Sequence, residues 1–312
     1  MSLAGNHRPI DTVPDVINGP HRSCTSEGTP SHETARDPAD SGAHPGRRPM
    51  SEEPVTLAVI DLSFHRATAA VVRRILEAHG HEVRTVEAPH EAAFGLLAEG
   101  RADVLVSAWL PASHGTYLAA CGDAVQVLPT HYAPYCLWAV PPYVPAGPVR
   151  EIGDLARPDV ARRFTRIIDG INPGAGISRF SVRAVEEYGL GRQGYAFVPG
   201  TESTFTERVE RGIAAGEWFV VPLWRPQYLN LRHGLRPLGD PRGVLGGVDA
   251  ARPVVRREAA GRLHPAALAQ LENLWLGNEG VEAIDLLAHS GHLTPVEAAD
   301  RYRCGRSGPL GG

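Results

Sequence analysis

Two tryptophans are the residues whose type and position most clearly suggest chemistry. Trp109 and Trp224 each follow an apolar, strand-like run, and each stands two residues before a proline. An indole face attracts cations, including a quaternary ammonium group that has no N–H to donate. A single tryptophan is more often part of a core, but two at matching strand ends favour a ligand-binding role. The pair therefore predicts two walls of a cation site.

A glycine-rich turn, DGINPGAGI at residues 169–177, lies between a strand-like run and a helical pattern. Gly176 permits close backbone approach, and a helix is expected to begin at Ile177. Unpaired N–H groups at a helix start bind anions such as a carboxylate. The turn is neither a Walker loop nor a GxGxxG motif, which disfavours a nucleotide, and a plain strand-to-helix turn is the alternative. Together with the tryptophans, the turn suits a small zwitterion.

Four further residues are weaker candidates for the same site. Gln227 follows the second tryptophan and could donate a hydrogen bond to a carboxylate, and Tyr135 could add an aromatic wall. Phe64 and His65 follow the first predicted strand, where a loop would face the cleft. For each of the four, an ordinary loop or surface role is the alternative.

No pattern in the sequence calls for catalysis, a metal or a cofactor. The motifs GxSxG and HExxH are absent, and the cysteines form no CxxC or Cys/His cluster. They are Cys24, Cys121, Cys136 and Cys304. We interpret them as isolated thiols, with a disulfide between Cys121 and Cys136 left open. The expectation is a protein that is not an enzyme and needs no metal or cofactor.

Composition limits the class of protein and its partners. The chain has 312 residues, of which 43% are hydrophobic, and this is ample for a core. A net charge of −4 argues against nucleic acid as a partner. No apolar run approaches the ~20 residues that span a membrane, and no signal peptide or lipobox is visible at the start. Residues 1–53 lack periodicity and predict a disordered extension, with Met50 as a plausible start, and residues 305–312 predict a flexible tail.

Hydrophobic periodicity predicts a doubly lobed α/β fold. Strands at 55–60, 81–86 and 103–108 alternate with helices at 66–79 and 89–99, which implies a parallel sheet with ligands at the carboxyl ends of its strands. The later elements are strands at 137–140, 165–168, 195–198, 218–222 and 254–256, and helices at 177–188, 202–215, 265–275, 280–289 and 295–302. We expect one lobe at 54–144 plus 249–304, a second lobe at 145–248, and a ligand cleft between them.

Residues from about 55 to 302 resemble the substrate-binding proteins of ABC importers for glycine betaine, proline betaine and choline. The resemblance rests on AWLPASHG (108–115), GINPGAGI (170–177), AVEEYGL (184–190), EWFVVPLWRPQY (217–228), LGDPRGVLGG (238–247) and LTPVEAADRY (293–302), in matching order and spacing. It implies a type II periplasmic-binding-protein fold that closes like a Venus flytrap. Trp109 and Trp224 match two tryptophans of an aromatic cage for the trimethylammonium group, and Gly176 and Ile177 match the carboxylate-binding turn.

Three positions depart from the family pattern. The family usually has a tryptophan after the first strand, where this chain has Leu62, with Phe64 as a possible substitute. It commonly has a histidine where Gln227 stands, and an acidic or amide residue where Ser107 stands. A missing aromatic wall weakens binding of a methylated ammonium by ~1–2 kcal/mol. This leaves open a different small zwitterion or cation as the ligand.

The resemblance implies a monomeric substrate-binding component that works outside the cytoplasmic membrane and delivers its ligand to an ABC permease. Because no export signal is visible, the alternative is a cytoplasmic sensor or carrier of a non-betaine ligand on the same scaffold. An enzyme on this scaffold is a third reading. It would need a reactive residue near Asp61, Phe64 and His65.

Overall fold

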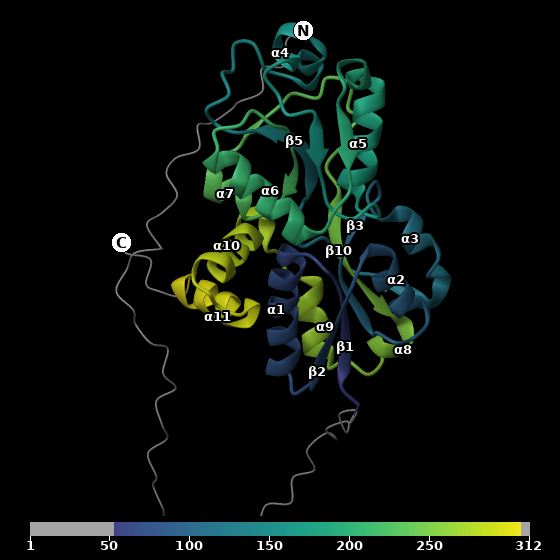
Figure 1. Cartoon of the computed structure of the whole chain (residues 1–312). Helices are drawn as coiled ribbons and strands as arrows, with labels where there is room; N and C mark the ends of the chain where they lie inside the picture. Colours follow the sequence, from purple (N-terminus) through teal and green to yellow (C-terminus); the bar gives the residue numbers. More distant parts are fainter. Residues whose placement is uncertain (1–52, 307–312) are drawn as a thin grey trace, which may run out of the picture. The chain divides into compact units, whose positions relative to one another are not determined.

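The computed structural model describes residues 53–306, and those up to Asp300 belong to one compact unit (Figure 1). Apart from Glu53, the predicted N-terminal extension lies outside the described residues. Helix α11 (Pro295–Arg306) includes residues 305 and 306, which the sequence had predicted as tail, and the rest of that tail is also outside the described residues.

A five-stranded sheet has the order β2-β1-β3-β10-β4. The strands β1 (Val55–Ile60), β2 (Val83–Ala88) and β3 (Val104–Leu110) are parallel, as predicted, and Val55 lies beside Val83. The strand β10 (Ala250–Arg256) returns antiparallel to β3 and also pairs with the short β4 (Val125–Val127). The sheet is therefore mixed, because β10 alone runs against the other four strands.

Alternate residues of β1 enter two separate hydrophobic cores, as the two-residue period of a strand requires. Leu57 packs in a core that includes helices α1 (Ser63–Ala78) and α9 (Pro265–Glu272). Ile60 packs in a second core that includes α2 (His90–Ala98). Figure 1 shows α1 and α2 on opposite sides of β1. Each fully buried aliphatic side chain contributes about 1.5–3 kcal/mol, so the strand is held from both faces.

A second group of strands carries the other half of the cleft. The strands β5 (Tyr135–Val140), β8 (Val221–Arg225) and β9 (Arg236–Pro237) form an antiparallel sheet in the order β8-β5-β9. The strands β6 (Ile167–Asp169) and β7 (Ala196–Val198) form a parallel pair. Residues 137–140, which are predicted to belong to the first lobe, form part of β5, and β5 pairs with β8 and β9. The two-lobe fold is thus present, and the exact lobe boundaries stay a prediction.

Helices α5 (Gly176–Glu187) and α6 (Glu202–Ala214) match, to within one residue at each end, the helices predicted at 177–188 and 202–215 in the second lobe. Most of the short helices were not predicted, because segments of four or five residues carry no periodicity. The short helices are α3 (Gly115–Ala119), α4 (Pro158–Ala161), α7 (Leu229–His233) and α8 (Arg257–Ala260), with 3-10 turns at Gly122–Ala124, Ile152–Ala156 and Leu190–Gln193. The longer helix α10 (Gly277–Ser290) contains the predicted helix at 280–289.

Within residues 53–306, no helix combines the length and the apolar character needed to cross a membrane. Cys121 and Cys136 are both free thiols, so the disulfide left open by the sequence is not formed.

Candidate functional site

A small cavity of about 20 Å3 lies between the two groups of strands. Six of the eight candidate residues line it: Phe64, His65, Trp109, Gly176, Ile177 and Trp224. They come from α1, β3, α5 and β8, which are far apart in the chain. The structure therefore brings both tryptophans and the glycine-rich turn to one place.

Phe64 lies between the two tryptophans. Its ring centroid is 5.2 Å from that of Trp109 and 5.8 Å from that of Trp224, and the rings are tilted by 40° and 56°. The sequence placed Phe64 in a loop, but α1 begins at Ser63, so the ring projects from the first helical turn. Leu62, the N-cap residue of α1, also lines the cavity. Phe64 thus supplies an aromatic ring beside the tryptophans, and aromatic faces of this kind attract cations.

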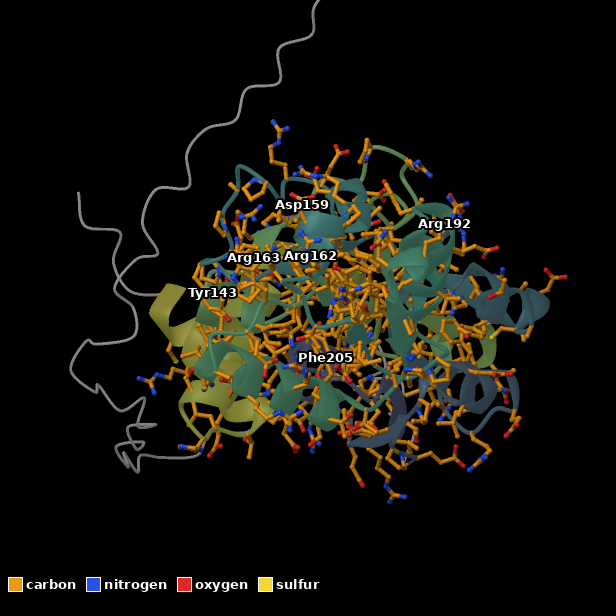
Figure 2. All side chains as sticks on the ribbon, turned by 45° about the horizontal axis from the view of Figure 1, so that its top comes forward. Tyr143, Asp159, Arg162, Arg163, Arg192 and Phe205 are labelled. Carbon is orange, nitrogen blue, oxygen red and sulfur yellow. The ribbon has the colours of Figure 1, made fainter. Side chains whose placement is uncertain are left out.

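Both tryptophans are held by residues behind them. The Trp109 indole N–H donates to the Tyr132 hydroxyl over 3.0 Å, and that hydroxyl is 2.5 Å from Ser107 Oγ. Burial raises the pKa of Tyr132 to about 12, so it stays a neutral phenol. Trp224 stacks on Phe205, an interior residue of α6 (Figure 2), at 5.8 Å between centroids. Each indole plane is fixed by a buried partner that the sequence analysis did not identify.

The tryptophans lie inside their strands rather than beyond them. β3 and β8 each run one residue past Trp109 and Trp224, whereas the sequence predicted that both strands end earlier. The peptide bonds that precede Pro111 and Pro226 are cis. Because the pleat of a strand sets the direction of each side chain, the rings are oriented by the sheets and not by mobile loops.

The N-terminus of α5 faces the same cavity. The helix begins at Gly176, no side chain caps it, and no backbone acceptor among the described residues engages the N–H groups of Gly176 or Ile177. Unpaired N–H groups and the positive end of the helix dipole favour a carboxylate there. The sequence expected this arrangement, and the helix begins one residue earlier than predicted.

Arg179 ties this turn to the other lobe. Its guanidinium donates to the carbonyl of Gly174 and to the carbonyl of Ser113, each over 2.5 Å. The Tyr117 hydroxyl also donates to the Gly174 carbonyl, over 2.9 Å. Ser113 and Tyr117 follow β3, whereas Gly174 and Arg179 belong to the predicted second lobe. These bonds hold the two sides of the cavity together.

A second link joins the lobes at the start of α1. The Glu202 carboxylate of α6 accepts from the Ser63 backbone N–H over 2.8 Å and also pairs with Arg66. A carboxylate at a helix N-terminus satisfies unpaired N–H groups and complements the helix dipole. The partners are 139 residues apart in the chain, so no local pattern could have revealed the contact.

Three neutral histidines line the cavity. Burial lowers the pKa of His65 and of His114 well below the usual value, and it lowers the pKa of His90 to about 4. His114 Nδ1 accepts the backbone N–H of Trp109, so its other nitrogen carries the proton. No acidic side chain is among the lining residues. In the described part of the chain, no group of three or more His, Cys, Asp or Glu side chains is placed to hold a metal ion.

Gln227 and Tyr135 are not among the residues that line the cavity. Gln227 is fully buried, and its Oε1 accepts the backbone N–H of Leu229 over 2.6 Å, so it shapes the first turn of α7. Tyr135 begins β5 and pairs with Arg225 of β8. Sequence proximity to Trp224 or to a strand end does not fix which way a side chain points, and a ligand contact by Gln227 or Tyr135 stays a prediction.

Comparison with known proteins identifies the family of this chain. Residues 53–303 match the family described as the substrate binding domain of ABC-type glycine betaine transport system. A curated relative, the glycine betaine/carnitine transport binding protein GbuC of Listeria monocytogenes serotype 1/2a (strain 10403S), is 24% identical over 147 residues, which is 47% of this chain. The matched segment spans about half (48%) of that relative.

Solved structures show the same fold over most of the chain. Lactococcal OpuAC, in a closed-liganded conformation with glycine betaine, is 26% identical with a TM-score of 0.72, covering 82% of this chain and 96% of its own. The glycine/betaine/L-proline-binding protein ProX of Borrelia burgdorferi is 22% identical with a TM-score of 0.70, covering 80% and 92%. The chain has the two-lobe periplasmic-binding-protein fold, and it belongs to the family of substrate-binding domains of ABC-type glycine betaine transport systems.

Proposed function

We propose that this protein binds a small, net-neutral methylammonium zwitterion of the glycine betaine class and presents it to an ABC permease. The observation that carries the proposal is the placement of Phe64 between Trp109 and Trp224 in a cavity that also receives the N-terminus of α5. The aromatic corner, which is formed by the rings of Phe64, His65, Trp109 and Trp224, suits the ammonium group. The start of α5 suits the carboxylate.

The aromatic rings supply the main attraction for the positive end of the ligand. Phe64, Trp109 and Trp224 are each 5% exposed or less, so a cation among them loses most of its water. A desolvated cation–π contact contributes about 2 kcal/mol, compared with about 0.5–1 kcal/mol at an exposed site. Three neighbouring rings thus favour a soft, weakly hydrated cation such as a methylated ammonium.

The neutral lining favours a ligand that balances its own charge. A buried cation without a partner is costly, and the cavity holds no acidic side chain to compensate one. The free N–H groups of Gly176 and Ile177 add partial positive charge, which favours a carboxylate by about 0.3–1 kcal/mol. A zwitterion satisfies both ends, whereas choline leaves its positive charge uncompensated.

Ligand release requires that the two lobes separate, because contacts between the lobes bury the residues that line the cavity. A ligand that contacts both sides favours the closed state through its differential affinity for that state. A permease could then distinguish the liganded form by its closed shape. Neither step involves covalent chemistry, so the proposed role is binding and delivery rather than catalysis.

Isothermal titration calorimetry of the full chain with glycine betaine and with choline tests the proposal. We expect glycine betaine to bind with micromolar or tighter affinity and choline to bind at least tenfold more weakly, about 1.4 kcal/mol. Absence of heat with both ligands, on protein that unfolds cooperatively, would contradict the proposal. Equal affinities would contradict the carboxylate assignment.

We expect Arg179→Met to weaken zwitterion binding by about tenfold, mostly through faster dissociation. Methionine keeps the apolar stem but removes the bonds to Ser113 and Gly174, and charge-assisted hydrogen bonds contribute about 1.5–3 kcal/mol. Stopped-flow dissociation of a bound ligand gives the rate. Arg183→Met, one turn further along α5, removes only an exposed ion pair with Glu187 and is the matched control. Equal effects of both variants would rule out the link across the cavity.

A further inference from the structure

Two residues of the aromatic corner carry buried polar atoms that nothing in residues 53–306 satisfies. His65 Nε2 and Trp224 Nε1 are both buried without a hydrogen-bond partner among the described residues, and both residues line the cavity. Buried polar groups are almost always paired. A third lining residue, His90, also has a buried nitrogen, Nδ1, without a partner among the described residues. Unpaired nitrogens around one cavity therefore indicate hydrogen-bonding groups that belong to the ligand.

His65 is part of the corner that receives the ammonium group. Its ring centroid lies 4.2 Å from that of Phe64 and 5.9 Å from that of Trp109. Burial, reinforced by the nearby His114, lowers its pKa well below the usual value, so the ring is neutral at physiological pH. A neutral imidazole has one acceptor nitrogen and one N–H. With its proton on Nδ1, the His65 ring presents the unpaired Nε2 to the corner as a hydrogen-bond acceptor.

The acceptor matters because a trimethylammonium group cannot use it. Such a group presents only C–H around its nitrogen and would leave the imidazole acceptor buried and unpaired, which is unfavourable. An ammonium that keeps one N–H could donate to His65, forming a charge-assisted bond. The Trp224 indole is a donor only, so its natural partner is the ligand carboxylate.

We propose that the preferred ligand is a zwitterion whose ammonium keeps at least one N–H, such as an N-methylated or N,N-dimethylated amino acid, and that His65 selects it by accepting that N–H. The inference rests on the proposed function, since it concerns the same cavity. It narrows the ligand class from fully methylated betaines to tertiary and secondary ammonium zwitterions.

N,N-dimethylglycine and glycine betaine test the inference, because they differ by a single methyl group on the nitrogen. Calorimetric titration of the full chain at pH 7.5 should show dimethylglycine binding at least tenfold more tightly. His65→Phe removes the acceptor and adds an aromatic ring, so it should reverse the order of the two ligands. His65→Gln, whose amide oxygen is an acceptor, should keep dimethylglycine ahead.

His131→Phe is the matched control. His131 is also a buried histidine with unpaired nitrogens, but it is not among the residues that line the cavity. It should leave the ratio of the two affinities unchanged. Equal or tighter binding of glycine betaine to the unmodified chain would overturn the inference while leaving the proposed function intact. An unchanged ratio in both His65 variants would overturn the role of His65, and failure of both ligands to bind would remove the proposed function itself.

Discussion

Replacing Gly176 by alanine is expected to weaken zwitterion binding at least a hundredfold, about 2.7 kcal/mol, with little change in the free energy of unfolding. A Cβ atom at Gly176 would lie 2.6 Å from Ser113 Oγ, 2.9 Å from its Cβ and 3.2 Å from its Cα. Gly176 and Ser113 belong to opposite sides of the cavity. The added methyl therefore keeps the lobes apart without disturbing either core.

Ser113 cannot easily move out of the way. Its backbone N–H donates to the Asp249 carboxylate over 3.0 Å, and its carbonyl accepts from Arg179 over 2.5 Å. The clash is with backbone atoms as well as with the hydroxyl, so rotation of the serine side chain does not relieve it. The least costly response is to open the cavity, which removes the contacts that hold the ligand.

Gly174→Ala, in the same turn, is the matched control. Its Cβ would meet the Tyr117 hydroxyl at 3.3 Å and Asn172 Oδ1 at 3.4 Å, which a small adjustment accommodates. The double variant Gly176→Ala with Ser113→Gly should recover part of the lost affinity, and a double-mutant cycle would measure that coupling. Wild-type affinity in Gly176→Ala, measured by calorimetry alongside urea unfolding, would show that the close contact is not needed for binding.

The sequence was sufficient for the three parallel strands and the returning strand of the first sheet, although not for β4, and it identified most of the residues that line the cavity. The bounds of β1 are predicted correctly, because VTLAVI is apolar at every position except the threonine, as expected for a strand buried on both faces. Trp109, Trp224 and the glycine-rich turn were identified because aromatic residues at strand ends and glycines before a helix have recognisable local patterns. Local patterns thus predicted the parts that line the cavity.

The residues that support the site were not predictable, because their partners lie far away in the chain. Tyr132 holds Trp109 across 23 residues, and Glu202 caps α1 across 139 residues. Gln227 shows the same limit, because its position beside Trp224 predicts a ligand contact, whereas in the structure its Oε1 accepts the backbone N–H of Leu229 in the next turn. Tertiary packing decides such orientations, and sequence spacing alone does not encode them.

The buried histidines have a consequence for stability that no single motif predicts. Burial lowers the pKa of His90 to about 4 and that of His131 to about 3, and the pKa values of His65 and His114 are also lowered well below normal. In the unfolded chain these groups titrate near pH 6.5. Between pH 6.5 and pH 4 the unfolded state therefore binds more protons than the folded state, and stability falls as the pH falls.

We expect the protein to lose several kcal/mol of unfolding free energy between pH 7.5 and pH 5. At pH 5 a histidine that stays neutral when folded contributes a loss of about 2 kcal/mol, so His90 and His131 together account for about 4 kcal/mol. His289 acts in the opposite direction. Burial opposes its charged form, but Asp285 more than offsets this and raises its pKa, so acidification stabilises the fold through that group. The stabilisation from this one histidine is smaller than the loss of unfolding free energy from the four buried histidines together.

Urea unfolding at pH 7.5 and at pH 5 measures the effect, and His131→Phe isolates one contribution. His131 is fully buried, stacks on Tyr132 at 5.2 Å and has both ring nitrogens unpaired among the described residues. Phenylalanine keeps the stacked ring and removes the titrating group, so the pH dependence should shrink by about 2 kcal/mol. Stability at pH 7.5 should not fall, because an unsatisfied polar ring is replaced by an apolar one. If the variant keeps the full pH dependence, His131 is protonated when folded and its burial is not the source of acid sensitivity.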